Sequence, residues 1–215
     1  SVAVGAGLQT TAVLTDMNQV LGRTAGNALE VRETIEWLTG ASDDPRLTEV
    51  VLALGAEMLV LVGLATDLVS ATEHLAAVRA DGSAAERFQK MVSALGGPAD
   101  LIENPDAHLG VAAVQQPVFA EHSGYVQTID TRSVGLAIVA LGGGRMRVND
   151  PIDHTVGLTD VIGLGEFVDN ERPLCIVHAR SDAEAAVAAA AIRAACTVGA
   201  TPPVEGPVIA SRITS

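Results

Sequence analysis

The sequence is poor in aromatic residues and in cysteine, and each shortage limits what the protein can be. Aromatic residues make up 2% of the 215 residues, whereas hydrophobic residues make up 48%. The core must therefore be built from Ala, Val, Leu and Ile, in a chain long enough to bury a substantial core. Cys175 and Cys196 are too few for a disulfide framework, so a reduced, cytoplasmic protein is expected.

Positive charge is also scarce. The net charge is −13, and Lys90 is the only lysine beside twelve arginines. A nucleic-acid-binding protein needs a basic face, so the composition argues against nucleic acid as a partner. Phosphate sites use Lys, Arg, Ser or Thr side chains or several backbone N–H groups, and a chain this acidic tends to repel phosphate.

Long apolar runs are missing as well. The best candidate, residues 58–69, is interrupted by Asp67 and is interpreted as a buried helix, because a bilayer span needs roughly 20 apolar residues. The chain opens without Met and without a positively charged leader. No membrane partner is therefore expected.

The first hundred residues predict one strand followed by helices. A short buried strand over residues 10–15 leads into a polar turn. A helix is expected to start at Asn27, with Glu30 in the capping-box position, and to stop at Gly40. Asp44-Pro45 starts the next helix. Its apolar residues recur with helical spacing and predict a broad buried stripe: Leu47, Val50, Val51, Leu54, Met58, Leu61 and Val62.

Three capping boxes and one aspartate cap predict four further helix starts along the chain. Two lie in the helical part, at Ser70 with Glu73 and at Ser83 with Glu86, and a third lies at Ser181 with Glu184. Asp130 is expected to cap another helix that ends at Gly142-Gly143-Gly144. Beyond a connecting segment at residues 98–117, strands are expected over residues 118–120, 124–129, 154–156, 174–179 and 208–213.

Residues 11–33, TAVLTDMNQVLGRTAGNALEVRE, carry the strongest family signal. Further collinear motifs follow at residues 39–40, 45–47, 57–58, 96–97, 124–126, 130–132, 142–145, 152–153, 172–174 and 177–179. Together these motifs closely resemble the thymidine and pyrimidine-nucleoside phosphorylase family, over almost the whole chain.

The resemblance implies a fold and a domain organisation. It implies an α/β protein in which residues 1–110 form the C-terminal part of the nucleoside phosphorylase α/β catalytic domain. Residues 111–215 would then form an α/β hammerhead-like domain. The family also implies a homodimer, whose interface would lie mainly outside this chain.

The function implied by the resemblance is phosphorolysis by a pentosyltransferase. Phosphate, as co-substrate, attacks the anomeric carbon of thymidine or deoxyuridine and releases the base and 2-deoxyribose 1-phosphate, with no cofactor required. The family's phosphate-binding and base-binding residues all correspond to positions before Ser1. No catalytic or cofactor-binding residue is therefore assigned here, and this chain is expected to be inactive alone.

One functional set of the family does fall within the chain. Some members bind a monovalent cation through backbone carbonyls and a carboxylate, and the matching positions are Leu21, Thr24 and Glu33. Oxygen ligands suit a hard cation, and Glu33 would supply the charge. The alternative is that Glu33 is a solvated helix residue and that Leu21 merely packs.

Two non-catalytic alternatives remain open. The chain could be an α/β scaffold or binding module that kept this fold and lost the site. Residues 163–179 also resemble the hairpin of biotinyl and lipoyl carrier domains, but the carrier lysine is missing. The position after Asp169 is Asn170, a residue that tolerates the left-handed turn conformation, so the hairpin is interpreted as scaffold. The five histidines show no metal-ligand spacing, and Gly142-Gly143-Gly144-Arg145 is interpreted as a helix end rather than an anion loop.

Overall fold

The computed structural model describes residues 2–204 and 206–214, and the chain forms two compact units. One unit combines Ser1–Asp16, Glu36–Ala99 and Gly206–Ser215, and the other combines Met17–Ile35 with Asp100–Glu205. The division falls within helix α2 (Asn27–Thr39). Each unit is assembled from separated stretches of the chain, whereas the prediction divides the chain once, between residues 110 and 111. The structure therefore does not test that domain boundary, which stays a prediction.

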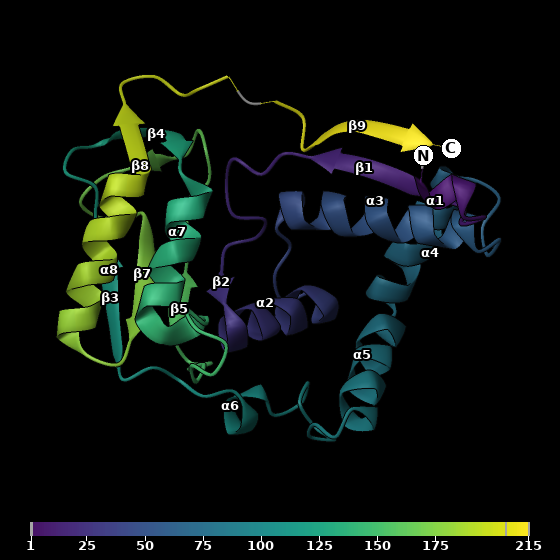
Figure 1. The fold of residues 1–215 in the computed structure, drawn as a ribbon, viewed down its shortest axis with the longest axis horizontal. Coiled ribbons are helices and arrows are strands. Elements are labelled where there is room, and N and C mark those ends of the chain that lie inside the picture. The colour runs from purple at the N-terminus through teal and green to yellow at the C-terminus, as the bar shows by residue number, and fades with distance from the viewer. Residues whose placement is uncertain (1, 205, 215) are drawn as a thin grey trace. The chain divides into compact units, whose positions relative to one another are not determined.

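The first unit is mainly helical. Strand β1 (Thr11–Thr15) pairs antiparallel with the C-terminal strand β9 (Ile209–Thr214), and the two lie side by side in Figure 1. The predicted strands at residues 10–15 and 208–213 are therefore confirmed. The remaining elements of this unit are helices: α1 (Val2–Gly5), α3 (Pro45–Leu61), α4 (Leu68–Ala80) and α5 (Ser83–Ala94).

Aspartates rather than serines cap helices α3 and α4, and no side chain of the described residues caps α5. Asp44 caps α3 as predicted, because its Oδ1 accepts the N–H of Leu47 at 2.9 Å. The capping box predicted at Ser70 is wrong: Asp67 caps α4 and accepts the Ser70 N–H at 2.8 Å. The box predicted at Ser83 is also wrong, since Gly82 precedes α5 and the Ser83 hydroxyl donates to Asp81. In both cases a carboxylate upstream of the serine is the stronger acceptor.

The predicted apolar stripe of α3 is only partly buried. Val50 is buried, but Val51, Leu54 and Met58 are 37%, 44% and 66% exposed. Helix α3 packs mainly against α4. The side of α3 that carries the other residues therefore remains exposed, and the prediction of a broad buried stripe is wrong for them.

The second unit is an α/β structure with two small antiparallel sheets. One sheet has the order β2-β5-β7-β3 and the other has the order β6-β4-β8. The first comprises β2 (Ala25–Gly26), β5 (Gly157–Thr159), β7 (Cys175–Ala179) and β3 (Val114–Val118). The second comprises β6 (Phe167–Val168), β4 (Gly124–Ile129) and β8 (Cys196–Gly199).

Besides residues 27–35 of α2, the described part of this unit has three helices and one π-helix. They are α6 (Pro105–His108), α7 (Thr131–Ile138), its continuation η1 (Val139–Gly143) and α8 (Asp182–Ala195). Asp130 caps α7 and Ser181 caps α8, as predicted. The core between helices and sheets is aliphatic, also as predicted, with Val118, Leu158, Leu174 and Val177 at most 2% exposed.

Some strand predictions for this unit need correction. Strands β4 and β7 match residues 124–129 and 174–179, but β3 precedes the predicted 118–120 and β5 follows the predicted 154–156. The carrier-like hairpin is not a strand pair, because β6 and β7 belong to different sheets. Within the described residues Asn170 does not adopt a left-handed conformation; Asp169 instead accepts the N–H groups of Glu171 and Arg172, each at 2.8 Å.

Within residues 2–204 and 206–214, no helix combines the length and the apolar character that a membrane crossing requires.

Candidate functional site

The predicted cation site lies in the second unit, where Leu21 and Thr24 belong to the loop before α2 and Glu33 belongs to α2 itself. The Glu33 carboxylate accepts the backbone N–H of Arg23 at 2.5 Å and the Thr24 hydroxyl at 2.6 Å. A Cβ atom at Gly22 would lie only 2.6 Å from both carboxylate oxygens of Glu33. The loop therefore wraps closely around this carboxylate, and it does so because residue 22 has no side chain.

The arrangement suits a cation in its chemistry. Neither donor that holds the Glu33 carboxylate carries a formal charge, so these two bonds leave its negative charge in place. Backbone carbonyls, a hydroxyl and a carboxylate are hard oxygen ligands. The structure thus brings together Thr24 and Glu33, two of the three predicted ligands.

Leu21, the third predicted ligand, has no hydrogen bond to Glu33 in the described chain that would join it to the site. Its side chain is 41% exposed. Only its backbone carbonyl would serve as a ligand. Among the described residues no group of three or more His, Cys, Asp and Glu could hold a metal. The predicted cation site has only one carboxylate, and its other ligands are backbone carbonyls, so the absence of a cluster of His, Cys, Asp and Glu does not test it. The cation site stays a prediction.

An ion-pair cluster fixes the loop to the rest of this unit. Glu166 pairs with Arg23 and also with Arg172, the latter at 2.8 Å, and it accepts the Gly163 N–H at 2.7 Å. Burial would raise the pKa of Glu166, but the hydrogen bonds from Arg23 and Gly163 and the two positive charges lower it to about 2. Glu166 therefore stays ionised and holds Arg23 beside the candidate cation site.

A second bond braces the same loop. The Gln19 side chain accepts the N–H of Leu164 at 2.9 Å. Residues 19 and 23 are thus both tied to residues 161–166, which lie about 140 positions away in the sequence. No spacing rule in the sequence could have paired them. These contacts were missed by sequence reasoning.

The start of α2 differs from the prediction. Glu30 reaches back to the N–H of Gly26 at 2.8 Å, so Gly26 rather than Asn27 occupies the capping position. The Asn27 side chain instead donates to the carbonyl of Gly143 at 2.8 Å. The helix ends before Gly40, as predicted, and Gly40 adopts a φ of 76°.

The glycine run at residues 142–145 ends a helix, as the sequence indicated. Gly142 has a φ of 96° inside η1, and its carbonyl accepts the N–H of Asp153 at 2.9 Å. With the Gly143 carbonyl bound to Asn27, this loop contributes acceptors to the fold. The interpretation as a helix end is confirmed.

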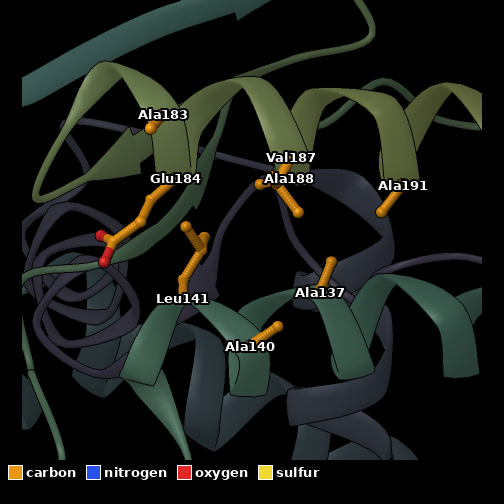
Figure 2. Close-up of a pocket in the computed structure, with 8 residues that line it drawn as sticks. All are labelled: Ala137, Ala140, Leu141, Ala183, Glu184, Val187, Ala188 and Ala191. Atoms are coloured by element: carbon orange, nitrogen blue, oxygen red, sulfur yellow. The ribbon is translucent and has the colours of Figure 1, made fainter.

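An apolar cavity of about 260 Å³ lies between α8 and the α7–η1 segment. Figure 2 shows its lining side chains projecting from the two helices toward each other, with Leu141 and Glu184 at one end. Five of the eight lining residues are alanines, so the cavity reflects small side chains at a helix–helix contact. It offers little hydrogen bonding for recognition.

The two thiols are packed rather than activated. Cys175 is fully buried, and burial, with smaller contributions from Cys196 and Asp160, raises its pKa to about 12. Burial likewise raises the pKa of Cys196 to about 11. A nucleophilic cysteine needs a lowered pKa, so both residues fit the structural role predicted for them.

Comparison with known protein families gives two matches. Residues 2–85 match the a/b domain of the glycosyl transferase family, and residues 125–199 match the C-terminal domain of pyrimidine nucleoside phosphorylase. The two matches occupy separate stretches of the chain, in the order that the sequence motifs indicated.

These matches define a protein of the glycosyl transferase class that carries an additional C-terminal α/β domain. Both matches agree with the thymidine and pyrimidine nucleoside phosphorylase family, which the collinear motifs of the chain resemble.

Proposed function

We propose that this protein takes part in the phosphorolysis of thymidine or deoxyuridine. A phosphate oxygen forms a bond to C1′ of the deoxyribose while the bond from C1′ to N1 of the base breaks. The base leaves with that electron pair and takes up a proton, and 2-deoxyribose 1-phosphate is the second product. The observation that carries the proposal is the pair of collinear family matches, at residues 2–85 and 125–199.

We also propose that the 215 residues do not perform the reaction by themselves. The chain has a net charge of −13 and a single lysine, whereas the reaction must hold a phosphate anion and stabilise charge on the leaving base. In this proposal the described residues support a phosphate and nucleoside site that further residues complete. The same proposal includes a homodimer, a hammerhead-like C-terminal domain and a cytoplasmic location, in which both cysteines stay free thiols.

A monovalent cation at Leu21, Thr24 and Glu33 is part of the proposal. The close wrapping of residues 22–24 around the Glu33 carboxylate supports it. A bound cation would supply positive charge that holds the loop in place. The chain's own contribution would be the fixed carboxylate, the Thr24 oxygen and the backbone carbonyl of Leu21.

The test is phosphate-dependent release of thymine from thymidine, with uridine as the comparison substrate. We expect no turnover by the 215-residue chain, and turnover when a separately made polypeptide carrying the family's phosphate-binding and base-binding residues is added. Release of thymine by the chain alone would contradict the proposed dependence on further residues. A stable mixture of the two polypeptides without turnover would favour a non-catalytic scaffold.

A further inference from the structure

A second cavity in the α/β unit, of about 230 Å³, carries more polar groups than the cavity of Figure 2. Its lining includes five polar side chains: Arg32 on α2, Asp106 on α6, Gln115 on β3, Thr159 on β5 and His178 on β7. Liquid water takes about 30 Å³ per molecule, so this volume corresponds to about eight waters or to one small organic molecule.

Three of the polar side chains come from neighbouring strands. Gln115 lies directly opposite His178 in the pairing of β3 with β7, so their side chains share one face of the sheet. Thr159 on β5 reaches the same ring, and its Oγ1 lies 2.9 Å from Nε2 of His178. The neighbouring Val177 faces the core instead, since side chains alternate along a strand.

His178 is an unusual residue for this position. It is 6% exposed, and within the described residues its Nδ1 has no hydrogen-bond partner. Leaving a buried polar nitrogen unsatisfied is unfavourable, so each such case calls for an explanation. Burial lowers the pKa of His178 although the charge of Asp160 opposes the shift, so the ring is neutral at neutral pH.

The same geometry argues against a nucleophilic role for Thr159. A histidine that activates a hydroxyl is itself oriented by a third group on its other ring nitrogen. In the described chain no group occupies that place, because Nδ1 of His178 has no partner. The pair is therefore better suited to binding than to covalent chemistry.

The charges around the cavity cancel. Nη2 of Arg32 lies 2.7 Å from Oδ1 of Asp106, and these are the only formally charged residues in the lining as described at neutral pH. An anion would have to compete with Asp106 for Arg32, and a cation would find its carboxylate already paired. The lining thus favours an uncharged ligand.

The remaining wall is apolar and includes Leu29, Leu109 and Val111. Such a cavity, apolar on most sides with a few convergent polar groups, is typical of small-molecule sites. Gln115 can donate and accept at once, and the hydroxyl of Thr159 has acceptor capacity beyond its bond to His178. A planar group with a donor beside an acceptor matches this set.

We propose that this cavity binds a small uncharged molecule that presents a planar amide or imide edge to Gln115 and Thr159, whose hydroxyl His178 holds in place, with its apolar body against Leu29 and Leu109. The site does not depend on the proposed phosphorolysis, since none of its residues was assigned to that reaction.

The experiment is an NMR titration of the 215-residue chain with 2-pyridone, a planar cyclic amide of suitable size. Benzoate serves as an anionic probe of similar size and toluene as an apolar one. We expect 2-pyridone at millimolar concentration to shift the ring signals of His178 and the methyl signals of Leu29 and Leu109. Equal or stronger shifts with benzoate or toluene would overturn the assignment of ligand chemistry.

Single substitutions then test the geometry. Gln115→Leu should weaken 2-pyridone binding about fivefold, the factor expected for one lost hydrogen bond. Gln116→Leu is the matched control, because the next residue of β3 points to the other face of the sheet. We expect its affinity to stay within twofold of the unmodified chain.

Gln115 is exposed, so its replacement leaves the fold intact and keeps the test interpretable. His178→Phe removes the ring nitrogen that holds the Thr159 hydroxyl, at similar volume, and should weaken 2-pyridone binding if the protein remains folded. No response of the cavity signals to 2-pyridone in the unmodified chain would refute the site. Equal losses of affinity in the Gln115 and Gln116 variants would refute it too.

Discussion

The carboxylate of Glu57 forms a two-point ion pair with the guanidinium of Arg212, a residue 155 positions later in the chain. Nη2 of Arg212 lies 2.8 Å from Oε2, and Nε donates to Oε1. Glu57 is only 6% exposed, and the hydrogen bond from Arg212 lowers its pKa although burial opposes the shift. A side-chain hydrogen bond from Thr11 adds to the shift. One buried carboxylate on α3 thus ties down both β1 and β9.

Arg212→Met should release the C-terminal strand from the first unit. The substitution leaves the buried Glu57 carboxylate without its charged partner, and an unsatisfied buried charge costs more than the net value of the lost bond. We expect a lower melting temperature and faster amide exchange in β1 and β9. Hydrogen exchange measured residue by residue by NMR checks this.

Arg87→Met is the control for that experiment, because Arg87 is an exposed arginine on α5 of the same unit. It should leave exchange in β1 and β9 unchanged. The effect should also depend on pH. The lowered pKa of Glu57 means that its stabilisation is present at neutral pH and is lost as the pH falls below about 4.5. Equal melting temperatures for the Arg212 variant and the unmodified chain at pH 7 would contradict the argument.

Glu166→Gln should make the second unit less sensitive to acid. The pKa of Glu166 falls from 4.5 to about 2 in the folded state, so its stabilisation is complete above pH 4.5 and is lost as the pH falls toward 2. A shift of this size corresponds to about 3 kcal/mol, which we reduce to about 1–2 kcal/mol because the side chain is a quarter exposed.

Urea unfolding at pH 7 and pH 3, followed by circular dichroism, measures this difference. The Glu166 variant should be less stable than the unmodified chain at pH 7. The difference between their free energies of unfolding should become smaller at pH 3. Glu171→Gln, an exposed carboxylate in the neighbouring turn, should show neither effect. If the difference in unfolding free energy is the same at both pH values, the carboxylate acts through packing alone.

Both thiols should resist modification in the native protein. Burial raises the pKa of Cys175 to about 12 and that of Cys196 to about 11, so only about one molecule in a thousand or fewer carries a thiolate at pH 8. We expect Ellman's reagent to titrate no thiol rapidly in buffer and both thiols in denaturant. Rapid reaction of one thiol per chain in buffer would contradict the burial seen here.

Local sequence signals predicted much of the fold. Asp44-Pro45, Asp130 and Ser181 begin helices where their chemistry indicated, because a cap bonds within its own first turn. Where two acceptors compete, as with Asp67 and Ser70, spacing alone did not identify the cap. The short strand β8 was not predicted, because four residues directly after a helix give no alternation to read.

In the candidate site too, the sequence predicted residues that lie close together in the chain and missed contacts between distant residues. Thr24 and Glu33 could be named in advance because they lie on one stretch of chain that resembles a family motif. The Arg23–Glu166 pair and the Thr159–His178 pair each join residues far apart in sequence, through strands and loops that no local pattern aligns. Such contacts follow from tertiary packing and become visible only in the structure.

Gly22→Ala tests whether the loop before α2 is a cation site. The new methyl group would lie 2.6 Å from both oxygens of Glu33, so the flexible end of the glutamate must move away from Arg23 and Thr24. We expect a loss of about 1–2 kcal/mol in stability from these hydrogen bonds. Stability measured in potassium chloride and in choline chloride at equal ionic strength separates the cation's contribution from that loss.

The unmodified chain should be more stable in potassium than in choline, and the Gly22 variant should lose this difference. Gly135→Ala is the matched control, since a Cβ there meets no atom within 4 Å and the residue lies within α7. It should raise stability by up to about 1 kcal/mol, through helix propensity, and keep the potassium response. If the unmodified chain is equally stable in both salts, Glu33 acts here through its bonds to the loop alone, and no cation contributes.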